Sequence, residues 1–495
     1  MNRRVYTPTI EEFKQKAGPG TVVPVYRDIL ADLDTPVSAF MKIDDGHDAF
    51  LLESVEQGEK WGRYSFLGTR PRMTVKGSDT ALEIIEDGKA RRRESGSSLD
   101  ALKELMGRYR AVHVEGAPRF CGGAIGYLGY DIIRQLERLP SLKPKELGLD
   151  DLYFIFTDTF MVFDNVEHKI KVISNAYINE GDDVEAKYNE AKAKIDALVD
   201  RLRETGMPRR KAASVECPDV ASNFRKADFC KAVERIKEYI SAGDVFQTVI
   251  SQRFSAPLVA EPIDIYRALR VVNPSPYMFF MRLGATTLAG SSPEILVRVD
   301  DGEVIVKPIA GTRRRGRDEA EDAELASELL ADPKERSEHI MLVDLGRNDV
   351  GRVARAGTVQ VDELMAVEKY SHVMHIVSNV RGELRDGLGV FDAFAACFPA
   401  GTLSGAPKVR AMEIIEELEP CRREVYGGAV GYAGFDGNMD MCIAIRTIVI
   451  TGGRLYIQAG AGIVADSVPE KEYEETENKA RGMWKAVQMA VEGMD

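Results

Sequence analysis

The sequence feature that most constrains the fold is a glycine-rich decapeptide that occurs twice. Residues 122–131 read GGAIGYLGYD and residues 427–436 read GGAVGYAGFD, so seven of ten positions are identical. Strands this rich in glycine let two backbones approach closely, and two distant copies do not make the repeat of a solenoid. We therefore predict two equivalent strands, one in each of two lobes. Chance similarity between two glycine-rich strands is the alternative.

The size and charge of the chain exclude several classes of protein. Its 495 residues exceed the roughly 250–300 at which a single hydrophobic core stops growing, so two lobes are expected. A formal net charge of −13 argues against a nucleic acid as partner. The same charge repels an anionic substrate at long range, so such a substrate needs a local positive site or a bridging metal ion.

The sequence does not indicate a membrane protein or an exported one. No run of residues approaches the roughly 18 apolar residues of a membrane span, and the first twenty residues lack the apolar segment of a signal peptide. No two cysteines have the C-x-x-C spacing of a zinc or redox motif. We therefore expect a cytoplasmic protein with reduced thiols and no membrane partner.

Composition and periodicity divide the chain into four segments. Residues 204–223 are polar, contain two prolines and have no periodicity, which is typical of a linker. Apolar residues recur at helical spacing before it, over residues 182–203, and after it, over residues 226–242, where Gly243 marks the stop. The expected segments are a leader (1–20), an N-terminal lobe (21–203), the linker (204–223) and a C-terminal lobe (224–495).

A strand over residues 304–306 leads into a corner of small residues, 310–312, whose backbone amides can hold an anion. A helix is expected over residues 321–330, and a second begins at Asp332-Pro333, an N-cap followed by a proline that suits the first turn. That helix should end before the polar stretch 344–349, which suits a pocket wall. Solvation is the alternative role for the arginines after the corner, Arg313, Arg314, Arg315 and Arg317.

Polar side chains also stand within apolar strands of the C-terminal lobe. Gln247 lies between apolar neighbours and needs hydrogen-bond partners. His372 and His375 occupy opposite faces of another strand, so one of them should face the interior. Arg446 lies in an apolar strand, and because buried arginines are rare unless paired, it needs an anion from the protein or from a ligand. Gln247 and His375 could equally be satisfied core residues.

Turns of small residues place further polar groups near backbone amides. Glu294 follows a Gly-Ser turn, and Thr402 lies in a corner that begins a helix, whose N-terminus favours anions. Residues 460–462 read Gly-Ala-Gly at the end of a hairpin strand. Ser467 is expected to begin a capping box for the last helix, and the acids in its first turns suit the helix macrodipole without any other role.

Taken as a string, this region resembles one family. PIAGTRRRG followed by ERSEHIMLVDLGRND is similar to the chorismate-utilising enzymes and, among them, to the large subunits of the anthranilate synthases. The matches run in order from about residue 49 to residue 482. The resemblance implies an α+β fold in which two interleaved lobes form a mixed β-sheet sandwich flanked by helices. It also implies chorismate, a dicarboxylate, as substrate and Mg²⁺ as cofactor.

The resemblance assigns roles to residues at matching positions. Glu294 matches the general acid for the departing C4 hydroxyl, and the other implied catalytic residues are Gln247, His375 and Thr402. The implied substrate contacts are Gly311, Thr312, Tyr426, Arg446, Gly460, Ala461 and Gly462. The implied metal ligands are Glu338 and Glu475. The implied contacts of tryptophan, the feedback inhibitor, are Glu53 and Ser54 together with Asn273, Pro276, Tyr277 and Met278.

Two positions distinguish the reactions that this family performs. The water-adding members carry a lysine base where this chain has Gln247, which cannot take a proton from water. The aminodeoxychorismate synthases typically read PIKGT, with a nucleophilic lysine where this chain has Ala310. Both positions indicate attack of ammonia at C2 and pyruvate elimination to anthranilate, the first committed step of tryptophan biosynthesis. Two alternatives stay open, an aminodeoxychorismate synthase and a non-catalytic amino-acid-binding subunit.

Ammonia needs a source, and the glutaminases that supply it in this family use a cysteine in a glycine-rich elbow. None of the cysteines here lies in such an elbow; they are Cys121, Cys217, Cys230, Cys397, Cys421 and Cys442. We therefore expect a separate glutamine amidotransferase subunit as partner, and activity on free ammonium without it.

Overall fold

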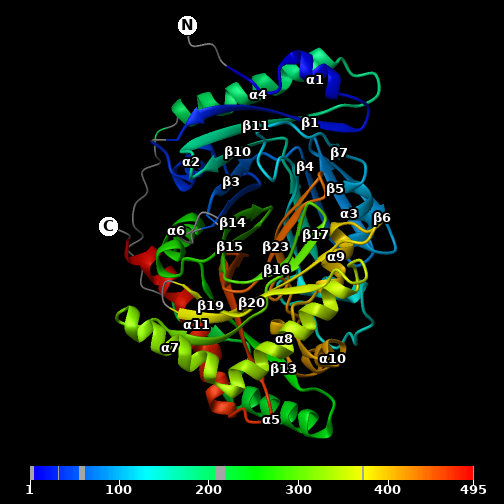
Figure 1. The fold of residues 1–495 in the computed structure, drawn as a ribbon. Helices are drawn as coiled ribbons and strands as arrows, with labels where there is room; N and C mark the ends of the chain where they lie inside the picture. The colour runs from blue at the N-terminus through cyan, green and yellow to red at the C-terminus, as the bar shows by residue number, and fades with distance from the viewer. Residues whose placement is uncertain are drawn as a thin grey trace.

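The computed structural model describes residues 5–31, 33–54, 62–204, 206, 218–370 and 373–493. His372 and most of the expected linker lie outside these residues. Within them the chain forms two large β-sheets with helices on the outside (Figure 1). Neighbouring strands are antiparallel except for one parallel pair, so the fold is α+β with a mixed sheet, as predicted.

The two sheets are named here sheet A and sheet B. Sheet A has the order β12 (Ala221–Ser222), β13 (Gln247–Pro257), β25 (Arg454–Ile463), β24 (Thr447–Thr451), β15 (Thr286–Ser292), β14 (Tyr277–Leu283), β2 (Ala49–Glu53), β3 (Tyr64–Thr69), β10 (Thr159–Asp164), β11 (Lys169–Tyr177), β1 (Thr21–Leu30) and β7 (Arg110–Ala111), with β21 (Gly405–Ala406) also paired to β13. Sheet B has the order β18 (Ile309–Arg314), β20 (Val373–Glu383), β17 (Glu303–Val306), β16 (Ile295–Asp300), β23 (Met439–Ile443), β22 (Ala429–Gly434), β8 (Gly123–Leu128), β9 (Leu152–Phe156), β4 (Met73–Ser78), β5 (Ala81–Glu86) and β6 (Lys89–Glu94), with β19 (Gln360–Lys369) also paired to β20.

Both sheets take strands from both halves of the chain. Strand β14 pairs with β2 in sheet A, and β22 pairs with β8 in sheet B. The facing surfaces share a core, since Phe160 and Phe280 of sheet A belong to the same buried cluster as Ile125 and Ile155 of sheet B. The halves of the chain are therefore interleaved in a two-layer sandwich, as the family resemblance implied.

The repeated decapeptide forms β8 and β22, which lie next to each other in sheet B, in register from Gly123 opposite Gly434 to Leu128 opposite Ala429. Glycine is needed for this close approach, because a Cβ on Gly123 would lie 2.1 Å from the carbonyl oxygen of Ala433. The two copies are therefore paired neighbours in one sheet, one from each of the two segments expected as lobes.

The chain passes between the two sheets at several places, two of which are neighbours. It leaves β15 of sheet A and enters β16 of sheet B through Pro293 and Glu294, and it leaves β23 of sheet B and enters β24 of sheet A through residues 444–446. The two crossings touch, since the Ile443 amide donates to the Glu294 carbonyl at 3.0 Å. Arg446 was expected within a strand, but it lies at the second crossing with a φ of +48°, because the backbone must turn from one sheet to the other.

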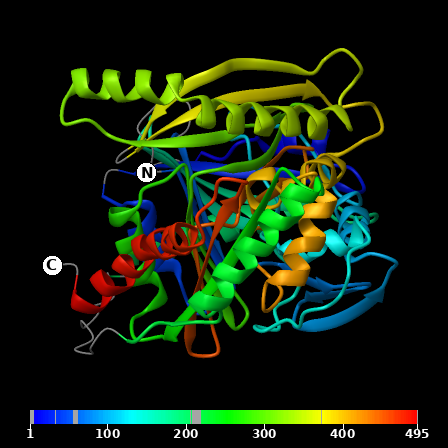
Figure 2. The same ribbon diagram turned by 90° about the horizontal axis from the view of Figure 1, so that it is seen from below.

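Helices cover the outer faces of the sandwich. In Figure 1, α1 (Ile10–Lys16) and α4 (Val184–Glu204) lie across β1 and β11, while α5 (Lys226–Ala242) lies at the opposite end. Figure 2 shows α7 (Glu319–Ala331) and α8 (Pro333–Gly351), both yellow-green, beside the yellow strands β19 and β20. The other helices are α2 (Pro36–Ile43), α3 (Ser98–Met106), η1 (Tyr130–Gln135), α6 (Pro262–Val272), α9 (Val390–Cys397), η2 (Gly401–Leu403), α10 (Lys408–Leu418) and α11 (Pro469–Glu492).

The sequence placed most helix starts correctly and some ends wrongly. Gly243 ends α5 in the left-handed conformation, and Asp332 caps α8 through the amides of Lys334 and Glu335, both as predicted. The stretch 344–349 is helical instead of ending α8, because Gly346 lets the helix lie close to β17 and β20. The last helix begins after Val468, whose side chain makes no capping hydrogen bond, so the capping box expected at Ser467 is absent.

The segment expected as a leader contains α1, whose Phe13 is fully buried against α4. No helix among the described residues is both long enough and apolar enough to cross a membrane.

Candidate active site

A cavity of about 640 Å³ opens where the chain crosses between the sheets. Its walls come from β13, β18, β25, η2, α8 and α11, elements far apart in sequence. Twelve of the thirteen residues predicted for catalysis, substrate binding or metal binding line it: Gln247, Glu294, Gly311, Thr312, Glu338, His375, Thr402, Tyr426, Arg446, Gly460, Gly462 and Glu475. The fold therefore gathers these residues at one place.

The carboxyl group of Glu294 is held by a neighbouring hydroxyl at the first crossing. The Thr402 hydroxyl of η2 donates to Glu294 Oε1 at 2.9 Å. Burial raises the pKa of Glu294 to about 7, against the Thr402 hydrogen bond and the charge of Arg446, which lower it. Near neutral pH this carboxyl group is therefore partly protonated, as a general acid requires.

His375 is fixed in one tautomer by β18. Its Nδ1 donates to the carbonyl oxygen of Gly311 at 2.8 Å and lies 3.1 Å from the Thr312 hydroxyl. A carbonyl oxygen only accepts, so the proton is on Nδ1 and Nε2 is the acceptor nitrogen. Burial lowers the pKa of His375, so the ring is neutral. Gly311, with a φ of +67°, forms the bulge that presents its carbonyl to the ring.

Arg446 offers an unpaired positive charge to the cavity. Among the described residues, no carboxylate or carbonyl accepts a hydrogen bond from its guanidinium group, although ion pairs satisfy most other arginines. Burial lowers its pKa, while Glu294 acts in the opposite direction. A half-buried guanidinium without a protein partner matches a carboxylate of a ligand, to which it can form two parallel hydrogen bonds.

Gln247 presents a carboxamide oxygen that has no hydrogen-bond partner among the described residues. Its Nε2 donates to Glu338 Oε1 at 3.3 Å, which fixes the amide orientation, and its buried Oε1 has no hydrogen bond. A Cβ on Gly462 would lie 2.5 Å from Gln247 Nε2, so glycine makes room for this side chain. The free oxygen can accept a hydrogen bond from an N–H group in the cavity.

The amides of residues 460–462 alternate in direction along β25. Ile250 of β13 lies opposite Ala461, and the Ser251 amide points away from β25, to Glu419 Oε1 at 2.8 Å. In an antiparallel ladder the Ala461 amide therefore faces β13, while those of Gly460 and Gly462 face the cavity. Ala461 was expected to contact the substrate, but its side chain packs in a buried cluster and it does not line the cavity.

Four carboxylates face one another across the cavity from two helices. They are Glu335 and Glu338 of α8 and Glu472 and Glu475 of α11. Burial, together with repulsion from Glu335 and Glu475, raises the pKa of Glu338. No three His, Cys, Asp or Glu side chains in the described residues are grouped closely enough to hold a metal ion alone. Two carboxylates that repel each other, with water and substrate oxygens, are a donor set that suits Mg²⁺.

Part of the arginine run after the corner is structural. Arg313 pairs with Glu328, Asp332 and Glu335, and Arg315 pairs with Asp322. These ion pairs tie β18 to the two helices that follow it. Arg314 and Arg317 pair with Glu321 but are 61% and 89% exposed, so the solvated alternative holds for these two. None of the four arginines lines the cavity.

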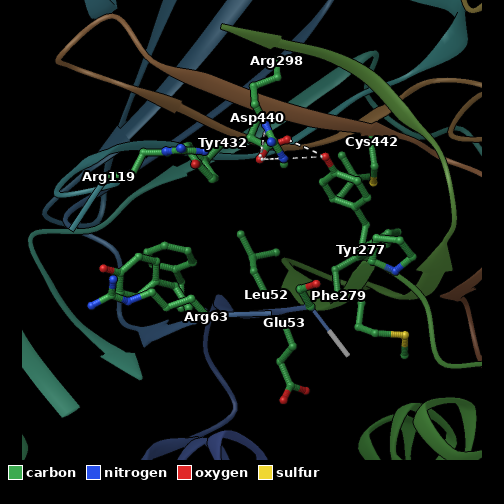
Figure 3. Close-up of a pocket in the computed structure, with 17 residues that line it drawn as sticks. Leu52, Glu53, Arg63, Arg119, Tyr277, Phe279, Arg298, Tyr432, Asp440 and Cys442 are labelled. Atoms are coloured by element: carbon green, nitrogen blue, oxygen red, sulfur yellow. Dashed lines mark hydrogen bonds and ion pairs between the residues drawn. The ribbon is translucent and has the colours of Figure 1, made fainter. Parts of the chain in front are cut away.

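A second cavity, of about 320 Å³, lies between β2, β14 and β23 (Figure 3). It is lined by five of the six residues predicted to bind tryptophan: Glu53, Ser54, Pro276, Tyr277 and Met278. Asn273 does not line it. This residue is the C-cap of α6, and its carbonyl accepts a hydrogen bond from the Ser291 hydroxyl of β15.

The polar groups of the second cavity divide into paired and unpaired ones. Glu53 is directed away from Tyr277 and Asp440 (Figure 3), and its carboxylate binds Tyr266 at 2.6 Å and Arg270 at 3.1 Å. Asp440 accepts from Tyr277 at 2.8 Å and pairs with Arg298 at 2.7 Å. Among the described residues, the buried Ser54 hydroxyl has no hydrogen-bond partner.

Sequence reasoning missed several residues of these cavities. Lys479 lines the main cavity, pairs with Glu475 at 2.7 Å and donates to the Gly460 carbonyl at 2.9 Å. Its spacing of four residues from Glu475 on one helix was a usable signal. Arg298 and Asp440 of the second cavity come from adjacent strands 142 residues apart, and no local pattern pointed to them.

The fold and the cavity define a class of enzyme. Residues 49–485 match the family model described as chorismate binding enzyme, so the chain belongs to that family. It is 50% identical over 493 residues to anthranilate synthase component 1 of Pseudomonas aeruginosa, covering 98% of this chain and 99% of that one. It is 48% identical to that of Acetivibrio thermocellus, over 99% of this chain and all of the relative.

A solved structure agrees with these relatives. The crystal structure of anthranilate synthase component I from Streptococcus pneumoniae has a TM-score of 0.78 and 39% identity, covering 92% of this chain and 99% of that chain. Within the chorismate-binding family, the chain therefore falls among the anthranilate synthase component 1 proteins, and its aminodeoxychorismate synthase and non-catalytic alternatives are not favoured.

Proposed function

We propose that the main cavity converts chorismate and ammonia into anthranilate, pyruvate and water. The observation that carries this proposal is a carboxyl group with a pKa of about 7, Glu294, beside Arg446, a guanidinium without a protein partner. One group supplies a proton near neutral pH, and the other supplies a counter-charge for a carboxylate. A dicarboxylate that must lose a hydroxyl group needs both.

Each group has a defined part in the proposed reaction. Arg446 binds a substrate carboxylate, and the amides of Gly460 and Gly462 add hydrogen bonds from the facing strand. Glu294 gives its proton to the C4 oxygen, which leaves as water while the nitrogen of ammonia bonds to C2. Gln247 Oε1 accepts a hydrogen bond from the ammonia and orients its lone pair toward C2. The new amine returns its surplus proton to the glutamate left by this step. The proton on C2 is then lost as the enolpyruvyl group leaves and its methylene carbon takes up a proton, which gives pyruvate and the aromatic ring.

Mg²⁺ is the metal that this donor set fits. Glu338 and Glu475 would hold it, with Glu335 and Glu472 adding negative charge nearby. When bound, the ion neutralises substrate carboxylate charge and the repulsion expected from a net charge of −13. Glu475 is paired with Lys479, so binding the ion requires that carboxylate to change partners.

The amine reaction is favoured over the other reactions of the family by two lining residues. A carboxamide at position 247 cannot act as a base toward water, and its free oxygen suits an N–H donor. Ala310 lines the same cavity and carries no nucleophile, which argues against covalent attachment of the ring as in the para-amino enzymes.

Ammonia, in this proposal, comes from a separate glutamine amidotransferase subunit in the cytoplasm, and the second cavity takes tryptophan as a feedback inhibitor. The support for the inhibitor is the size of that cavity, its aromatic and methionine lining, and the unpartnered Ser54 hydroxyl. In this proposal the Glu53 carboxylate does not contact tryptophan directly, because Tyr266 and Arg270 already bind it; Glu53 instead fixes the position of these two side chains.

The test is a fluorescence assay of the purified chain with chorismate, Mg²⁺ and excess ammonium salt. We expect growth of the anthranilate signal, its loss with EDTA, and its loss in Glu294→Gln. Consumption of chorismate without anthranilate, or formation of a para-substituted or hydroxylated product, would overturn the proposed reaction. Tryptophan can be added to the same reaction to test inhibition.

A further inference from the structure

One buried ion pair lies beneath the walls of the main cavity and has no role in the mechanism above. Arg423 and Glu419 are each 2% exposed and are joined by three hydrogen bonds, Nη2 to Oε1 at 2.6 Å and Nε to Oε1 and Oε2 at 3.2 and 3.0 Å. Glu419 also accepts from the backbone amide and hydroxyl of Ser251 at 2.8 and 2.7 Å. The pair is therefore fully satisfied, as a buried charge pair must be.

The remaining donors of Arg423 bind two backbone carbonyls that belong to cavity segments. Nη1 donates to Leu403 at 2.6 Å, and Nη2 donates to Val249 at 2.9 Å. Leu403 follows Thr402 in η2, and Val249 lies two residues after Gln247 on the same face of β13. One planar guanidinium group therefore holds the turn that orients Glu294 and the strand that carries the carboxamide.

The same guanidinium lies near a third wall. Its central carbon is 5.6 Å from the ring centre of Tyr426, which lines the cavity. The two hydrogen bonds from Arg423 to the Leu403 and Val249 carbonyls lie where the segment after η2 pairs with β13. In that pairing the Val249 amide donates to the Ser404 carbonyl at 2.9 Å, and Gln247 lies opposite Ala406. A shift of Arg423 would therefore move both segments together.

We propose that Arg423 is a positioning residue, which holds Thr402 against Glu294 and Gln247 toward the attacking ammonia without touching the substrate. This inference rests on the proposed function. Lysine would keep the charge beside Glu419, but an ammonium group is a point donor and cannot reproduce the planar fork that reaches both carbonyls. Arg423 contacts neither Arg446 nor Lys479, the other charged groups that act on Glu294.

The first experiment compares Arg423→Lys with Arg134→Lys. Arg134 is a matched control, because it also pairs with a carboxylate near the end of α10, Glu416, as well as with Asp131, and among the described residues it makes no hydrogen bond or ion pair with a residue that lines the cavity. We expect Arg423→Lys to lower kcat about 100-fold, to raise the KM for ammonia, and to leave the KM for chorismate, set by Arg446, within about threefold. Arg134→Lys should keep the kinetics of the parent. Unchanged kcat in Arg423→Lys, or an equal loss in both variants, would overturn the proposal.

A second measurement does not depend on turnover. Infrared titration of the Glu294 carboxyl, identified by its absence in Glu294→Gln, should give a higher midpoint in Arg423→Lys, because the Thr402 hydrogen bond that lowers it is lost. An unmoved midpoint would overturn the positioning role even if the proposed reaction is correct, and a moved midpoint supports it even if the product is not anthranilate. Should Arg423→Lys fail to fold, Glu419→Gln loosens the same fork with Arg423 in place, and the same two outcomes apply.

Discussion

In the proposed mechanism the hydrogen bond from Thr402 to Glu294 sets the pH range of activity, and Thr402→Val removes it while keeping the volume of the side chain. A hydrogen bond to a charged group contributes about 1.5–3 kcal/mol to stability, and about 1.4 kcal/mol corresponds to one pKa unit. Glu294 faces an open cavity, so the lower end of that range applies. We expect the pKa of Glu294 to rise from about 7 by about one unit.

The sign of the effect follows from the role of Glu294 as an acid. Its active form is protonated, so kcat/KM for chorismate falls as the pH rises through its pKa, and a raised pKa moves this alkaline limb to higher pH. The assay is anthranilate fluorescence at several pH values, with the concentration of free ammonia held constant. Thr402→Ser, which keeps the hydroxyl, is the control and should retain the parent profile. An alkaline limb that stays in place, or moves to lower pH, in Thr402→Val would refute the reasoning.

Four further outcomes are expected. Arg446→Ala should lower kcat/KM for chorismate at least about 100-fold with little change in thermal stability, because this guanidinium has no ion pair among the described residues and is proposed to bind the substrate; retained turnover would remove the site assignment. Gly462→Ala should raise the KM for ammonia about tenfold or more without changing that for chorismate, since its Cβ displaces Gln247; an equal rise in both would show a general distortion. Glu338→Gln should abolish the response of activity to Mg²⁺ and weaken Mg²⁺ binding measured by calorimetry, and unchanged binding would contradict the metal assignment. Ser54→Phe should fill the second cavity and abolish tryptophan inhibition while keeping anthranilate synthesis, so a variant that stays equally sensitive would contradict the inhibitor site.

Local patterns in the sequence were sufficient where local physics decides the structure. The stop of α5 at Gly243 and the start of α8 at Asp332 and Pro333 were predicted from capping and backbone preferences that act within a few residues. The predicted end of α8 was wrong. Gly346 lowers the helix propensity of this stretch, but the close packing of α8 on sheet B, which the missing side chain allows, compensates for that cost.

The site residues were predicted through motifs, but their chemistry was not. The sequence alone left Gln247 and His375 as possible core residues, and it placed Arg446 within a strand. Their roles depend on partners from other segments: the Gly311 carbonyl that sets the tautomer of His375, and the Thr402 hydroxyl that restrains the pKa of Glu294. These contacts are long-range, so no local pattern contains them.

The sequence by itself determined the family, the α+β class and most of the residues that gather in the cavity, because family motifs and helix signals each depend on a few neighbouring residues. Only the tertiary structure decided that the repeated strands pair with each other, that Ala461 faces the core, and that the Glu53 carboxylate is already bound by Tyr266 and Arg270. The direction of these side chains and the pairing of these strands depend on contacts between residues more than a hundred positions apart. Those contacts form where the chain passes between the two sheets, which exist only once the whole chain has folded.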